Sequence, residues 1–189
     1  MTVIVPKPAA TFIHIPKTGG VSISRWLTSN ANGSYLLEKS HGGKHADQER
    51  IARYLKQKDI DMGYTFCVVR NPWDRLVSAY HYYKRLKKMD VSFEHFIHGQ
   101  WKSSNKSNQW GCAEKQMHSY FYDIDYVLRF ESLNDDFKTI QQLFKCNKQL
   151  AKHNKSNHSD FREYYTPELV DIVATRHAKD IATFDYSFE

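Results

Sequence analysis

The residues best suited to chemistry lie in one short segment near the N-terminus, which reads Pro-Lys-Thr-Gly-Gly-Val-Ser at positions 16–22. A β-branched and aromatic run at 11–15 precedes it, and apolar residues at helical spacing follow it. We therefore predict a strand, a tight loop and a helix. Glycines let the backbone approach a ligand closely, and the amides that open a helix point at an anion. With a lysine charge and two hydroxyl donors added, the segment predicts a phosphate-binding loop.

This loop differs from the nucleoside-triphosphate loop GxxxxGK[ST]. Lys17 precedes the glycines, and no glycine stands five positions before it. An ordinary strand-to-helix turn is the alternative interpretation for a lone Gly-Gly pair. The combined Lys-Thr-Gly-Gly-x-Ser run after a strand is more specific than that.

A second candidate segment follows the apolar run 64–69, which we predict to be a buried strand. Asn71 is a good N-cap and Pro72 suits the first position of a helix, so a helix should begin there. Arg70 leaves the carboxyl end of the strand, where a charge needs a partner. Ser78 lies two turns along the helix. We expect Arg70 and Ser78 to face one site.

Two histidines between these segments are candidates for acid–base chemistry. His41 and His45 lie in or next to the polar stretch 30–44, and Asp47 is a plausible N-cap for the next helix. An imidazole with an unperturbed pKa of about 6.5 can accept a proton at neutral pH. A surface histidine without a function is the alternative. The position of His45 just before a helix favours it, because loops at the ends of strands and helices carry chemistry in α/β sheets.

The remaining elements predict the framework that must position these residues. A third strand is expected at 126–130, short helices at 93–97 and 116–122, and a last helix from Pro167 toward Phe184. Strands that alternate with amphipathic helices indicate an α/β fold, and we predict a single domain over 1–189. The polar segment 149–162 is either a mobile lid or a solvated connection. Trp101 and Trp110 bracket a polar loop and either pack into the core or stack on an acceptor ring.

Composition limits the choice of partner. The net charge of +6 favours an anion: a nucleotide, a sulfated or carboxylated glycan, a nucleic acid or a membrane surface. The three cysteines include no CxxC pair, so neither a disulfide framework nor a zinc site is indicated, and we see no other metal-ligand cluster. No apolar window approaches ~18 residues and no signal peptide is evident. We therefore expect a cytoplasmic protein with no membrane partner.

Taken together, the segments 16–22 and Arg-Asn-Pro-Trp-Asp-Arg-Leu-Val-Ser-Ala-Tyr at 70–80 resemble the two signature motifs of sulfotransferases. These enzymes use 3′-phosphoadenosine 5′-phosphosulfate (PAPS). The chain most resembles the carbohydrate sulfotransferase branch, and weaker similarity extends from Leu128-Arg129-Phe130-Glu131 to the C-terminal helix. The resemblance implies a P-loop-like three-layer sandwich with a mostly parallel central sheet flanked by helices.

The resemblance also implies roles for individual residues. Arg70 and Ser78 would hold the 3′-phosphate of PAPS, His45 in Lys44-His45-Ala46 would be the catalytic base, and Lys17 would stabilise the leaving phosphate oxygen. The residues implied to cradle the 5′-phosphosulfate are Lys17, Thr18, Gly19, Gly20, Val21 and Ser22. No metal is implied. The acceptor would be a hydroxyl, on a carbohydrate by analogy with the branch, and a nucleic-acid partner is not implied.

Two other functions stay open at this point. A small nucleotide or metabolite kinase is disfavoured by the missing GxxxxGK[ST] pattern and by the lack of a carboxylate suited to Mg²⁺ after a strand. A non-catalytic protein could instead bind nucleic acid or glycan through its basic surface. The absence of the N-terminal anchor and longer domain of Golgi relatives points to a compact, soluble, microbial enzyme.

Overall fold

The structure is a computed structural model that describes residues 1–38, 40, 43–87, 91–99, 111–151 and 159–189. Its internal contacts divide it into two compact units, and we describe each by itself. The sheet unit comprises Met1–Val69 and Ser119–Asn154, and the helical unit comprises Arg70–His118 and Lys155–Glu189. That the two make one domain stays a prediction.

The sheet unit is built on a five-stranded sheet in the order β3-β1-β2-β4-β5. The strands are β1 (Val3–Pro6), β2 (Ala9–Ile13), β3 (Tyr35–Leu36), β4 (Tyr64–Val69) and β5 (Tyr126–Arg129). β2 pairs with β4 and β4 with β5 in parallel, whereas β1 is antiparallel to both β2 and β3. Only β1 therefore runs against the other described strands, and the sheet is mostly parallel in direction.

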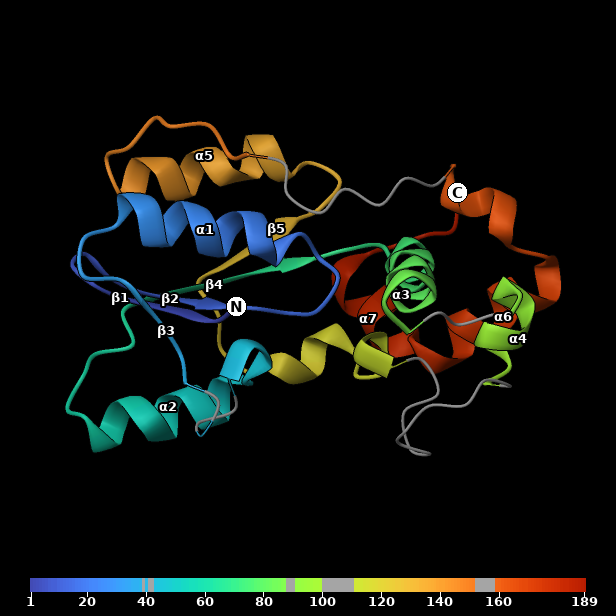
Figure 1. Cartoon of the computed structure of the whole chain (residues 1–189), viewed down its shortest axis with the longest axis horizontal. Coiled ribbons are helices and arrows are strands. Elements are labelled where there is room, and N and C mark those ends of the chain that lie inside the picture. The colour runs from blue at the N-terminus through green and yellow to red at the C-terminus, as the bar shows by residue number, and fades with distance from the viewer. Residues whose placement is uncertain (39, 41–42, 88–90, 100–110, 152–158) are drawn as a thin grey trace. The chain divides into compact units, whose positions relative to one another are not determined.

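Helices cover both faces of this sheet. Figure 1 shows α1 (Gly20–Asn30) and α5 (Leu133–Leu143) on one face and α2 (Gln48–Gln57) on the other. The short η2 helix (Gly43–His45) precedes α2. This three-layer arrangement confirms the predicted α/β fold, with a central sheet flanked by helices.

Alternating side chains of β2 connect the sheet to α1 and α5. Ala10 and Phe12 are fully buried in one cluster with residues of both helices, and the rings of Phe12 and Phe66 lie 5.3 Å apart. Trp26 of α1 packs edge-on against Phe137 of α5 at 5.0 Å, and its indole N–H donates to the Lys148 carbonyl over 2.7 Å. The core thereby holds the start of α1, and with it the predicted phosphate loop, against the end of β2.

The helical unit is assembled around α3. Its elements are α3 (Pro72–Lys87), α4 (Phe93–Ile97), η3 (Gly111–Ala113), η5 (Phe161–Tyr164), α6 (Pro167–Arg176) and α7 (Ala178–Phe184). In the chain, η4 (Met117–Tyr120) contains the point where the helical unit gives way to the sheet unit. One face of α3 is buried: Trp73, Leu76, Val77 and Tyr80 pack with Phe96 and Leu169.

Local sequence signals were sufficient for some elements and insufficient for others. β4 and α4 occupy the predicted ranges 64–69 and 93–97. The expected single C-terminal helix is instead α6 and α7, which meet at His177. β1 and β3 were not predicted, since four- and two-residue strands show too little alternation to be recognised. Trp101 and Trp110 lie outside the described residues.

Candidate active site

The predicted phosphate loop joins β2 to α1 in the sheet unit. Lys17 and Gly19 both adopt the left-handed backbone conformation, with φ of 67° and 83°. Gly19 is the N-cap residue of α1, so no side chain caps the first turn, and that turn contains no acidic residue. The positive end of the helix dipole therefore faces the loop without a local carboxylate to compensate it. This is the backbone arrangement that binds anions at helix N-termini.

Close packing explains both glycines of the loop. A Cβ on Gly19 would come within 3.1 Å of the Phe130 ring, and a Cβ on Gly20 would overlap the imidazole of His14. The Thr18 hydroxyl donates to the Ile15 carbonyl over 3.0 Å, so it braces the loop instead of pointing a donor outward. These contacts therefore hold the loop in place without a ligand.

The structure also places His45 in the sheet unit, at the end of η2. Its Nδ1 lies 3.0 Å from the His14 carbonyl oxygen, and the two imidazole rings are 4.7 Å apart. Asp47 caps α2 as predicted, by accepting from the Arg50 amide. Gln48, the first residue of α2, accepts from the Tyr122 amide over 2.9 Å. These contacts anchor the chain directly after His45. The alternative base, His41, lies outside the described residues.

The contact to the His14 carbonyl determines which nitrogen of His45 is basic. A carbonyl oxygen can only accept, so Nδ1 must carry the proton and donate it. In the neutral ring, Nε2 is then the nitrogen that can accept a proton. His45 is therefore held in the tautomer that a general base requires. His14 was not singled out from the sequence, because it lies inside the run 11–15 that was predicted to be a strand, whereas β2 ends at Ile13.

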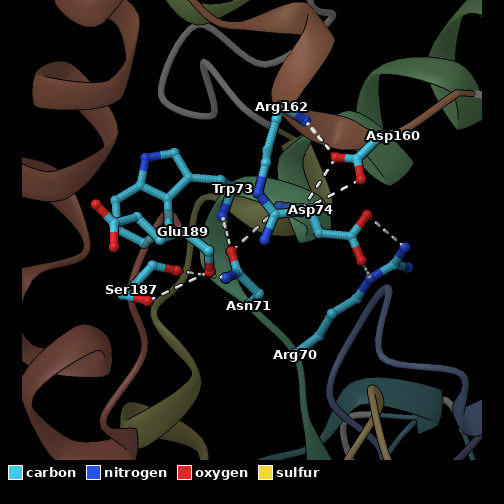
Figure 2. Close-up of polar contacts among 8 residues, drawn as sticks. All are labelled: Arg70, Asn71, Trp73, Asp74, Asp160, Arg162, Ser187 and Glu189. Carbon is cyan, nitrogen blue, oxygen red and sulfur yellow. Dashed lines mark hydrogen bonds and ion pairs between the residues drawn. The ribbon is translucent and has the colours of Figure 1, made fainter.

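In the helical unit, Arg70 at the end of the buried strand forms an ion pair with Asp74. Its Nε and Nη2 each donate to one carboxylate oxygen of Asp74 over 2.8 Å, and the two side chains are 6% and 15% exposed. Figure 2 shows the two groups facing each other edge to edge. The ion pair uses the Nε and Nη2 edge of the guanidinium and thereby fixes the orientation of this planar group. Ser78 is buried in the same helix, at 6% exposure.

The N-terminus of α3 is tied to the C-terminal residues of the chain. The Asn71 side-chain oxygen accepts from the Trp73 amide over 3.0 Å, which confirms the predicted N-cap. Its side-chain amide donates to the Ser187 carbonyl over 2.7 Å, as Figure 2 shows. The Phe188 ring packs against that of Trp73 at 5.6 Å. Arg70 therefore precedes a helix start that is braced by tertiary contacts.

A buried carboxylate network in the helical unit was not predicted. Asp180 of α7 is fully buried and accepts from the amides of Met117 and His118 over 2.7 and 2.8 Å. It also accepts from the ring of His118 at 2.8 Å and from that of His177 at 3.4 Å. Burial opposes ionisation, but the hydrogen bonds outweigh it and lower the pKa of Asp180 to about 2. No local pattern connects Asp180 with residues some sixty positions earlier.

The described residues were also searched for metal-binding groups and for membrane-spanning helices. Within the parts of the chain that the structure describes, no group of three or more His, Cys, Asp or Glu is arranged to hold a metal ion. Among the same residues, none of the helices has both the length and the apolar character needed to span a membrane.

Comparison with known proteins identifies the class. The model of the family described as "Sulfotransferase family" matches residues 1–187, so the chain belongs to the sulfotransferase family of PAPS-dependent enzymes. An uncharacterized protein of Archaeoglobus fulgidus is 30% identical over 93 residues, which are 49% of this chain and 76% of that protein. The crystal structure of a sulfotransferase from Alicyclobacillus acidocaldarius aligns over 94% of this chain and 96% of its own, with 16% identity and a TM-score of 0.49.

Proposed function

We propose that this enzyme transfers the sulfuryl group of PAPS to a hydroxyl of a carbohydrate, with His45 as the base. The observation that carries the proposal is the hydrogen bond from His45 Nδ1 to the His14 carbonyl, because it makes Nε2 the basic nitrogen in the unit that holds the phosphate loop. Family membership supports the donor. The carbohydrate acceptor rests on the similarity of the first motif to that of carbohydrate sulfotransferases.

The reaction needs positioning and charge stabilisation more than covalent help from the protein. The acceptor oxygen bonds to sulfur as the bond from sulfur to the 5′-phosphate oxygen breaks. In the proposed mechanism, His45 Nε2 takes the proton of the attacking hydroxyl. Lys17 and the backbone amides of the loop stabilise the charge that develops on the leaving phosphate oxygen. The residues proposed to cradle the 5′-phosphosulfate are Lys17, Thr18, Gly19, Gly20, Val21 and Ser22. Thr18 would contribute its backbone amide, since its hydroxyl is bonded to the Ile15 carbonyl.

For the 3′-phosphate we propose Arg70 and Ser78. The Asp74 carboxylate supports this role, since it binds one edge of the Arg70 guanidinium and holds the group in a fixed orientation. We also propose that the enzyme acts in the cytoplasm, as expected from its cysteine content.

The donor site is tested first by calorimetric titration with 3′-phosphoadenosine 5′-phosphate (PAP) and with adenosine 5′-monophosphate. We expect a marked preference for PAP, and a weaker affinity for PAP in Lys17→Ala. Equal affinity for the two nucleotides would contradict the proposal. Magnesium-dependent binding of ATP that is tighter than PAP binding would favour a kinase. Steep salt dependence with long polyanions, unchanged by Lys17→Ala, would favour a polyanion-binding protein.

The 3′-phosphate assignment is tested with a pair of variants. Arg70→Ala should weaken binding of PAP far more than binding of adenosine 5′-phosphosulfate, which lacks the 3′-phosphate. Asp74→Asn is the matched control, because it breaks the same ion pair but keeps the guanidinium. If Arg70 serves only to neutralise Asp74, the two variants will lose stability alike and neither will change the affinity for PAP selectively.

The base assignment is tested with His45→Ala and with His41→Ala as its control. Transfer from labelled PAPS is measured to a mixture of glucose, cellobiose and desulfated heparin. We expect His45→Ala to lower kcat by about 10²-fold or more while the affinity for PAP stays near normal. His41→Ala should retain turnover. The reverse result would assign the base to His41, and loss of PAP binding in His45→Ala would refute a purely catalytic role.

A further inference from the structure

The buried ring of His14 contacts two parts of the proposed catalytic apparatus in the sheet unit. His14 follows β2 directly and is only 4% exposed. Its ring packs against Gly20, the first residue of α1, and against the ring of His45 of η2. A single side chain therefore contacts both the anion-binding end of α1 and the proposed base.

The contact with Gly20 is too close for any other residue at that position. A Cβ there would overlap Cδ2 and Nε2 of the His14 imidazole, and the backbone of Gly20 is held as the first turn of α1. Glycine is thus the residue that lets the ring lie directly against the helix start. The ring cannot move toward α1, since the backbone of that helix blocks it.

The contact with His45 has two components. The His14 backbone carbonyl accepts the Nδ1–H of His45 over 3.0 Å, and the two rings meet with centroids 4.7 Å apart and planes tilted by 55°. The Phe12 ring stacks on His14 at 5.8 Å from the sheet side. The His14 ring is thus held by Phe12 and Gly20 and forms a fixed surface for His45.

We propose that His14 is a positioning residue whose ring fixes the distance of His45 from the N-terminus of α1 and so keeps the Nδ1–H of His45 in line with the His14 carbonyl, which sets the tautomer. The inference rests on the proposed role of His45 as the base. His14 touches neither reacting oxygen in this scheme and acts only through His45. A displacement of about 1 Å of a catalytic group can lower a rate by about 10²-fold, so a rigid spacer of this kind matters for turnover. Glycine is then required at position 20 for catalysis as well as for packing, because a Cβ there would displace the His14 ring.

The first measurement is spectroscopic and needs no acceptor. Imidazole ¹⁵N NMR of the whole protein reports the tautomer of each histidine, and the spectrum of His45→Gln assigns the His45 signals. We expect wild-type His45 to carry its proton on Nδ1. In His14→Ala the Nδ1-protonated fraction should fall, while in His14→Phe, which keeps a flat ring against His45, it should be largely retained.

The second measurement separates turnover from binding. With PAPS and the same carbohydrate mixture, His14→Ala should lower kcat by about 10-fold to 10²-fold, with the affinity for PAP within about threefold of wild type. His14→Phe should recover most of the loss. Phe137→Leu is the control for general destabilisation, since Phe137 packs in the same unit on Trp26. It should lower stability without changing kcat.

Definite results would overturn the inference. One is an unchanged His45 tautomer in His14→Ala, and another is an unchanged kcat in that variant. A third is a kcat that falls as much in Phe137→Leu as in His14→Ala when the two variants lose the same stability. Gly20→Ala provides a second variant, which pushes the ring from the helix side and should shift the tautomer in the same direction. If the wild-type protein transfers no sulfate, the proposed function fails, while the NMR comparison still decides whether His14 positions His45.

Discussion

Replacing Asp180 with asparagine tests the carboxylate network of the helical unit. Asp180→Asn keeps the shape of the side chain but exchanges one acceptor oxygen for an NH₂ group. The carboxylate accepts four hydrogen bonds, from two backbone amides at 117 and 118 and from the rings of His118 and His177. The asparagine oxygen cannot serve them all, and its NH₂ faces other donors. We therefore expect a large loss of stability from an isosteric change.

The size of the loss follows from the donors left unpaired. A buried donor without an acceptor costs about 1–3 kcal/mol, so two such donors predict a loss of about 2–6 kcal/mol in the free energy of unfolding at pH 7. Asp180 has no exposed surface on which water could replace the missing acceptor. A loss of this size is a large part of the stability of an ordinary domain.

The pH dependence distinguishes this network from simple packing. The pKa of Asp180 is about 2 in the folded protein against 3.8 for an exposed carboxyl. Because the folded value is the lower one, the ionised network stabilises the protein fully above about pH 4, and this contribution disappears as the pH falls through about 2. The difference between wild type and Asp180→Asn should therefore shrink by about 2 kcal/mol between pH 4 and pH 2.

Urea unfolding of both proteins at pH 7, 4 and 2, followed by far-UV circular dichroism and tryptophan fluorescence, measures this difference. A loss below about 1 kcal/mol at pH 7, less than a single unpaired donor costs, would refute the argument. If the stability difference between the two proteins stays constant from pH 7 to pH 2, the charge of Asp180 is irrelevant to stability.

Further predictions concern the free energy of unfolding of other variants, and the same urea unfolding experiment checks each of them. Burial lowers the pKa of His177, so the wild type should lose stability as the pH falls below about 6.5, and His177→Gln should lose less over that range. Gly63→Ala should cost about 3 kcal/mol or more, because its φ is +60° and a Cβ would overlap the Ala9 carbonyl. Gly33→Ala has a φ of +70° but open space, with the nearest atom at 3.7 Å, so it should cost only about 1 kcal/mol. Thr166→Ala removes the cap of α6 and should cost about 1 kcal/mol.

Features that depend on neighbours in the sequence were predictable. The strand at 64–69 is a continuous apolar run ended by an N-cap and a proline, and the structure has β4 and α3 at those positions. The N-caps Asp47, Asn71 and Thr166 all accept from the amides expected of them. Each depends on interactions within one turn of helix or on one strand period. The loop at 16–22 is of this kind, because glycine conformations and a helix start are local properties.

Pairing over short lengths was not predictable. β3 is two residues long and pairs with β1, which itself ends at Pro6. Neither strand has enough residues for an alternating pattern. Their pairing depends on β2 being in place beside β1.

The amino-acid sequence by itself determined the motifs, the caps and the order of the main strands and helices, since these follow from backbone preferences and periodicity within short windows. Only the tertiary structure decided how the candidate groups are held. The His14 carbonyl meets His45 across 31 residues of chain, and Asp180 meets the His118 amide across 62. Such contacts depend on how whole elements pack, so the tautomer of His45 and the low pKa of Asp180 could not be deduced from the order of residues.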